Sequence, residues 1–116
     1  MASPGPEPLL SVYENDPDVG EIVAVFVAEM PKRRADFVRA IEAGDLSQAV
    51  RLAHQLKGAA GGYGFETLGQ FAAAAEHALV DLGRSGNFDT SSLYAAAAPL
   101  IDACDRVRLA NSEAAA

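Results

Sequence analysis

The sequence has 116 residues, is half hydrophobic, and carries a net charge of −7 from 16 acidic and 9 basic residues. This length fits one small domain, and an acidic chain without tryptophan lacks the positive surface that nucleic-acid binding requires. A single cysteine, Cys104, excludes an internal disulfide and a multi-cysteine metal site, and we interpret it as a small core residue.

The chain begins with a segment that we expect to be a flexible N-terminal arm, residues 1–14. It contains Pro4, Pro6 and Pro8, which disfavour regular structure. It has no basic residue followed by a long apolar stretch, so it does not resemble a signal peptide. No apolar run in the sequence reaches the roughly 18 residues of a membrane span. We therefore expect a cytoplasmic protein without membrane association.

Helical periodicity begins after this arm. Asp16 and Pro17 suit the start of a first helix, because aspartate is a good N-cap and proline is tolerated in a first turn. Pro31 should break or kink that helix, since it lacks the N–H of a helix interior. A further stretch at about 31–43 then ends at Gly44. The pattern therefore predicts an additional short or kinked N-terminal helix.

Three more helices follow in the sequence. Asp45, with Gln48 three residues later, resembles a capping box and predicts a helix over about 46–60. A glycine-rich turn separates it from a helix predicted over about 65–82. Asp89 or Thr90 should cap the last helix, over about 91–109, in which Pro99 predicts a kink or a later start.

Short loops between long amphipathic helices favour antiparallel neighbours. We therefore predict an all-α fold, an antiparallel up-down four-helix bundle with an additional short or kinked N-terminal helix. The bundle domain should span residues 15–110, and residues 111–116 should form a frayed C-terminal tail.

The helix predicted at 46–60 carries a histidine on its polar side. On a helical wheel at about 100° per residue, its apolar residues gather on one side and His54 points to the other. Lys57 lies about 60° from His54 on this wheel. The nearest neighbours of His54 on the outer face are Ser47, Val50, Arg51, Gly58 and Gly61.

Gly58 lies inside this helix, where glycine costs roughly 0.5–1 kcal/mol relative to alanine. We interpret it as clearing space beside His54 for a second protein surface. Gly61 fits this clearing or a helix end equally well, and Gly62 and Gly64 are typical of a helix end. A neutral imidazole is a nucleophile, and Lys57 could neutralise a transferred phosphoryl group.

The segment from His54 to Gly64 resembles a known family signature. His54-Gln-Leu-Lys57-Gly58, followed by Gly64, is similar to the H-x-L-K-G-x5-G motif of histidine-containing phosphotransfer (HPt) domains. Gly44-Asp45-Leu46 and Ala53 also fit the family pattern, and the resemblance covers about residues 15–110.

The resemblance implies a phosphorelay intermediate. His54 would accept a phosphoryl group from an aspartyl phosphate on one receiver domain and pass it to the aspartate of another response-regulator receiver. Lys57 would be the charge partner of the phosphoryl group, Gly58 would leave room for the receiver, and Gln55 would orient the ring or the phosphate. Such a protein is a phosphocarrier without a kinase or ATP-binding domain.

The resemblance also implies partners and a cofactor. The partners would be receiver domains and a histidine kinase, which can be a hybrid kinase. Mg²⁺ would be held by the receiver, with no cofactor bound by this chain. Residues 46–60 and 65–75 should form the docking face, with apolar contact near Val50, and we expect a monomer.

Other functions fit the sequence less well. The glycines do not follow the order of a nucleotide-binding loop. The chain has only two histidines, His54 and His77, which leaves too few ligands for a zinc site. We interpret His77 as part of a solvated polar face with Glu66, Gln70 and Asp81. A hydrolase would need an oxyanion partner, which Ser47 lacks. The main alternative is an unphosphorylated helical adaptor that binds and regulates a receiver or kinase.

One further feature is a basic cluster formed by Lys32, Arg33, Arg34 and Arg39. A solvated helix face is one interpretation of it, and a docking patch for an acidic partner is the other.

Overall fold

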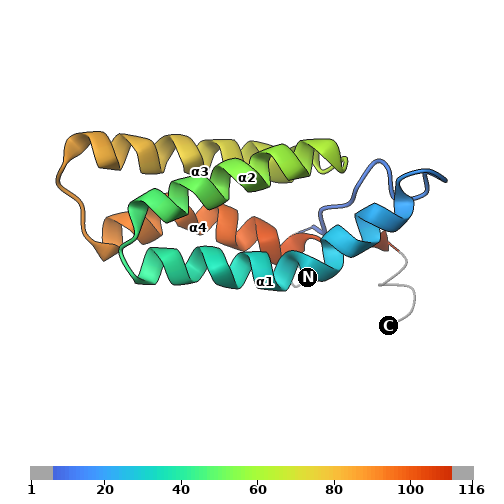
Figure 1. The fold of residues 1–116 in the computed structure, drawn as a ribbon, viewed down its shortest axis with the longest axis horizontal. Helices are drawn as coiled ribbons and strands as arrows, with labels where there is room; N and C mark the ends of the chain where they lie inside the picture. Colours follow the sequence, from blue (N-terminus) through green and yellow to red (C-terminus); the bar gives the residue numbers. More distant parts are fainter. Residues whose placement is uncertain (1–6, 111–116) are drawn as a thin grey trace, which may run out of the picture.

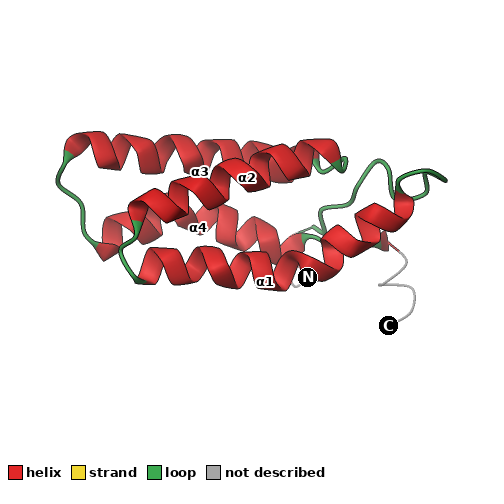
Figure 2. Cartoon of the chain, in the orientation of Figure 1, coloured by secondary structure: helices red, strands yellow, loops and turns green. Residues whose placement is uncertain are grey.

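The computed structural model describes residues 7–110, which fold into a bundle of four helices. They are α1 (Gly20–Glu42), α2 (Leu46–Gly62), α3 (Glu66–Ser85) and α4 (Thr90–Arg106). Each helix packs on the next, and α1 packs on α4 to close the bundle (Figure 1). Figure 2 shows only short loops between the helices. The predicted all-α antiparallel bundle is therefore confirmed.

The expected additional N-terminal helix is wrong. α1 continues through Pro31 as one helix of 23 residues, so the two predicted stretches form a single element. Figure 1 shows α1 bent rather than broken, with its blue N-terminal part at an angle to the teal part. Proline removes one backbone hydrogen bond, but Phe26 and Phe37 are buried on either side of it. This packing on both sides holds the helix together.

Two of the predicted caps are present. The Asp45 carboxylate accepts a hydrogen bond from the backbone N–H of Gln48 at 3.1 Å, at the start of α2. The Asp89 carboxylate accepts one from the N–H of Ser92 at 2.8 Å, at the start of α4. These contacts also lower the pKa of Asp89, with the Ser92 N–H as the main cause. The helix α4 continues through Pro99 and does not start later.

The core is apolar throughout the described residues, in which no polar or charged residue is buried. Cys104 lies in it as predicted, and burial raises the pKa of its thiol to about 12, so the thiol stays protonated. The facing sides of α2 and α3 are built from small residues. A Cβ added at Gly69 of α3 would lie 3.7 Å from the Cβ of Ala60 of α2. This close approach lets side chains on one helix reach the other.

Residues 1–6 and 111–116 lie outside the described residues, and so do the expected C-terminal tail and part of the expected arm. The described part of the arm, residues 7–14, makes hydrogen bonds to the ends of α2 and α4. None of the helices in residues 7–110 is both long and apolar enough to span a membrane.

Candidate functional site

The outward face of α2 carries His54 and Lys57, one helical turn apart. The His54 side chain is 65% exposed, so the predicted orientation away from the core is confirmed. The Lys57 side chain is half-exposed. Ala53 and Ala60 are fully buried on the opposite side of α2 and fix its rotation.

A carboxylate from α3 joins these two side chains. One oxygen of Glu76 lies 2.8 Å from Nδ1 of His54, and the other lies 2.9 Å from Nζ of Lys57. The Glu76 side chain is only 20% exposed, because it lies in the seam between α2 and α3. The three side chains therefore form one cluster across two helices.

The protonation state of this cluster follows from Glu76. The hydrogen bond from Lys57 is the main cause that lowers the pKa of Glu76, and the contact with His54 lowers it further. Glu76 is therefore ionised at neutral pH and can only accept hydrogen bonds. A neutral His54 ring must then carry its proton on Nδ1, which leaves the lone pair on Nε2. Nε2 is then the nucleophilic nitrogen of a side chain that is 65% exposed.

The helix surface beside His54 is bare. Apart from its chain neighbours and the nearby backbone of α2, a Cβ added at Gly58, Gly61 or Gly62 would meet no atom within 4 Å. Gly61 and Gly62 are still helical, so α2 extends two residues beyond its predicted end, and Gly64 makes the turn. An approaching protein surface could therefore reach the His54 ring without meeting side chains from this stretch.

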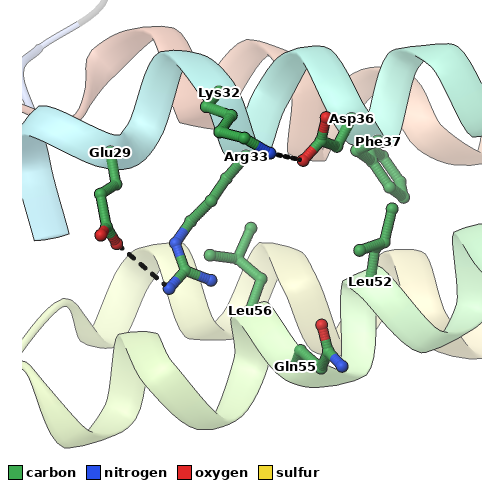
Figure 3. Close-up of a pocket in the computed structure, with 8 residues that line it drawn as sticks. All are labelled: Glu29, Lys32, Arg33, Asp36, Phe37, Leu52, Gln55 and Leu56. Carbon is green, nitrogen blue, oxygen red and sulfur yellow. Dashed lines mark hydrogen bonds and ion pairs between the residues drawn. The ribbon is translucent and has the colours of Figure 1, made fainter.

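A groove with an apolar floor runs between α1 and α2 (Figure 3). Gln55 lies on the α2 side of this groove. Among the hydrogen bonds of residues 7–110, none joins Gln55 to His54. The orienting role expected for Gln55 stays a prediction, and in this structure Glu76 is the residue in contact with the ring. The groove is lined by Glu29, Lys32, Arg33, Asp36, Phe37, Leu52, Gln55 and Leu56.

The basic cluster on α1 is neutralised by the chain's own carboxylates, which favours the solvated-face interpretation. Lys32 also lowers the pKa of Asp36 through its hydrogen bond. Exposed pairs of this kind contribute about 0–1 kcal/mol each. The four ion pairs are Lys32–Asp36 at 2.8 Å, Arg39–Asp36 at 3.1 Å, Arg33–Glu29 at 3.5 Å and Arg34–Asp105 at 2.9 Å.

The other predicted neighbours of His54 differ in their surroundings. Ser47 is exposed in the first turn of α2, and Val50 is half-buried against the core. The guanidinium of Arg51 donates a hydrogen bond to the side-chain oxygen of Gln48 at 2.6 Å. Within residues 7–110, no hydrogen bond joins these residues to the His54 ring, so their role in docking stays a prediction.

His77 lies on the exposed face of α3, as expected. Its side chain is 81% exposed, and Nε2 lies 3.4 Å from a carboxylate oxygen of Asp81 on the same helix. Within residues 7–110, no group of three or more histidine, cysteine, aspartate or glutamate side chains is arranged to hold a metal ion.

Sequence reasoning missed Glu76. A wheel of α2 contains no information about the helix that packs beside it. A signal was present in α3, where Glu76 lies about 40° from the buried Ala72, at the edge of the apolar stripe. An acidic side chain at such an edge is directed toward a neighbouring helix. Lys57 on α2 is the cation with which Glu76 forms an ion pair.

The chain matches a known protein family. The Hpt domain matches residues 21–111, which is most of the chain, and the chain therefore belongs to the Hpt domain family. No curated protein and no solved structure gives a significant match.

Membership of this family implies histidine phosphotransfer within a phosphorelay. Hpt domains generally relay phosphoryl groups between kinases and receivers. The four helices of residues 7–110 form the Hpt bundle, and membership of this family makes the domain a phosphocarrier.

Proposed function

We propose that His54 accepts a phosphoryl group from the aspartyl phosphate of one receiver domain and passes it to the aspartate of another. The observation that supports this most is the exposed His54 ring, whose Nδ1 contacts Glu76 at 2.8 Å and whose Nε2 has no hydrogen-bond partner among residues 7–110. Lys57 completes the cluster, and the bare surface at Gly58 gives a receiver access to the ring.

The transfer begins with attack of the Nε2 lone pair on the phosphorus atom of the aspartyl phosphate. The new N–P bond forms as the P–O bond to the aspartate breaks, and the carboxylate leaves with the electron pair. The ring gains positive charge, while its proton stays on Nδ1 against the Glu76 carboxylate. The reverse sequence delivers the phosphoryl group to the next aspartate.

Lys57 and Glu76 have different parts in this proposal. Lys57 can turn toward the phosphoryl oxygens and balance their negative charge, since a lysine side chain is long and flexible. Glu76 holds the Nδ1 proton and stabilises the ring cation during transfer. Phosphoryl transfer depends mostly on such positioning and charge compensation. Two charged partners and one nucleophile therefore suffice on this side of the complex.

Mg²⁺ belongs to the receiver in this proposal. The ion would neutralise charge on the aspartyl phosphate within the receiver's acidic pocket. The expected cytoplasmic location stays a prediction, and so does the monomeric state.

The test is phosphotransfer profiling against the receiver domains of the same cell. Each receiver is phosphorylated and mixed with the protein, and the labelled phosphoryl group is followed. We expect rapid transfer from at least one receiver, giving an acid-labile adduct on this chain. Receivers that bind the protein but leave it unlabelled would instead support the unphosphorylated adaptor.

A further inference from the structure

The described part of the N-terminal arm, residues 7–14, is fixed to the bundle at two points. Near its start, Leu9 is buried and pairs with the end of α4, where its N–H donates to the carbonyl of Arg106 at 2.6 Å. Further on, the N–H of Val12 donates to the carbonyl of Gly64 at 3.1 Å, and the hydroxyl of Ser11 donates to the carbonyl of Tyr63. The arm therefore crosses the end of α2.

Gly64 is the position on which the arm sits. Its φ of +83° suits glycine, and a side chain would also collide with the arm. An added Cβ would lie 2.8 Å from Oγ of Ser11, 2.8 Å from Cδ2 of Tyr13 and 3.1 Å from Cγ2 of Val12. The turn that ends α2 therefore sets the place of the arm.

At this place the arm exposes apolar side chains. Val12 is 78% exposed and Tyr13 is 42% exposed. Both line a shallow groove together with Lys57 and Gly61 of α2. Leu9 and the hydrogen bonds of Ser11 and the Val12 backbone already hold the arm, so the fold gains little from the exposed side chain of Val12. Its exposure next to the lysine of the His54 cluster requires another explanation.

The usual size of a protein interface offers an explanation for the exposure of Val12. A specific interface covers about 800 Å² on each partner, which corresponds to a disc of roughly 16 Å radius. Seven residues of helix separate Gly61 from His54, a distance of about 10 Å along α2. Because Val12 and Tyr13 line one groove with Gly61, a receiver centred on His54 would also cover them.

We propose that Val12 and Tyr13 form part of the surface that docks the receiver domain. This inference rests on the proposed function and adds the arm to the docking face, which the sequence had placed on α2 and α3 alone. The partner fits as a receiver with an apolar patch beside its phosphorylated aspartate. That patch would cover Val12 while the aspartate reaches His54.

The test compares two phosphoryl donors on the full chain. One donor is the phosphorylated receiver that transfers best to the unchanged protein. The other is phosphoramidate, a small donor whose P–N bond breaks with loss of ammonia as the bond to the imidazole forms. Only the first donor needs a docking surface.

Val12→Asp should lower kcat/KM for transfer from the receiver about ten-fold and leave labelling by phosphoramidate unchanged. Val12→Ile should behave as the unchanged protein. Phe88→Asp is the control at another exposed apolar residue, in the loop between α3 and α4 at the end of the bundle opposite the arm (Figure 1). It should transfer normally.

Several results would overturn the inference. Equal kcat/KM values for Val12→Asp and the unchanged protein would remove the arm from the interface. Parallel loss of labelling by both donors would mean that the arm supports the His54 site rather than docking. A protein that sediments as a dimer, and as a monomer after Val12→Asp, would make the patch a contact between copies. If phosphoramidate labels His54 but no receiver does, the proposed function fails as well.

Discussion

The two histidines of the chain form a comparison within one molecule. His54 on α2 and His77 on α3 are both exposed, and both have a carboxylate within ion-pair distance. Exposure and an acidic neighbour therefore do not distinguish a reactive histidine from an ordinary surface histidine.

The difference lies in where each carboxylate comes from. Asp81 is one turn from His77 on the same helix and is 56% exposed, so solvent screens this pair. Glu76 reaches His54 from a neighbouring helix, is mostly buried, and is shared with Lys57. A contact between helices fixes the ring relative to the bundle, which a contact along one exposed helix cannot do.

The largest expected effect on phosphotransfer comes from replacing each histidine by glutamine in a separate variant. His54→Gln should abolish capture of the phosphoryl group, and His77→Gln should leave capture unchanged. Labelling from a phosphorylated receiver measures both, with circular dichroism as the check that helicity is retained. Full labelling of His54→Gln would show that the site is assigned to the wrong residue.

The next effect should come from the lysine beside His54. Lys57→Ala should slow transfer about 100-fold, the lower end of the range for loss of one charge-stabilising group, because Lys57 is partly exposed. Receiver affinity, measured by titration calorimetry, should fall much less. Lys32→Ala is the matched control, since the ion pair of Lys32 within residues 7–110 is with Asp36 on its own helix. Equal losses of rate and affinity would reduce Lys57 to a surface contact.

Adding bulk to the bare surface should separate stability from transfer. Gly58→Leu should raise the free energy of unfolding by about 0.5–1 kcal/mol, because glycine is a poor helix former and a Cβ added at this position lies in open space. Transfer from the receiver should nevertheless fall about ten-fold, through overpacking at the interface. Ala98→Leu, on the exposed side of α4, is the control. Unchanged transfer in Gly58→Leu would remove the steric argument.

The smallest expected effect concerns stability at acid pH. The pKa of Glu76 is lowered below its ordinary value of 4.5, mainly by Lys57, so its ionised form stabilises the folded state. This contribution is complete above pH 4.5 and is lost as the pH falls through the lowered pKa. Glu76→Gln should therefore lower the free energy of unfolding by less than about 1 kcal/mol at neutral pH. As the pH falls into the acid range, the free energy of unfolding of this variant should decrease less steeply than that of the unchanged protein. Urea unfolding between pH 7 and pH 3 measures it.

Asp81→Asn is the comparison for this last prediction. Asp81→Asn should change the free energy of unfolding little at neutral pH, since the pair of Asp81 with His77 is exposed on one helix and screened by solvent. A pH profile of Glu76→Gln that follows the unchanged protein would show that the contact between α2 and α3 adds nothing to stability.

Much of the fold could be predicted from the sequence, because helix ends and apolar stripes are local signals. Asp45 and Asp89 cap the helices that they were expected to cap, and the wheel placed His54 outward. Pro31 misled the prediction, since local rules count its lost hydrogen bond but not the packing of Phe26 and Phe37 around it.

The site could be predicted only in part, for a related reason. His54, Lys57 and Gly58 share one helix, so their spacing alone brings them together. Glu76 is 22 residues from His54, and its contact depends on how closely and in which register α2 and α3 pack. The place of the arm depends equally on the turn at Gly64. A helical wheel describes one helix and cannot predict contacts between two elements.

The most direct test of the central claim is to locate the phosphoryl group on the ring. The protein, labelled with ¹⁵N in its histidine rings, is phosphorylated by the receiver and its imidazole resonances are recorded by NMR. We predict a phosphoryl group on Nε2 of His54, a proton retained on Nδ1, and an unchanged His77. A phosphoryl group on Nδ1, on His77 or on neither histidine would contradict the account.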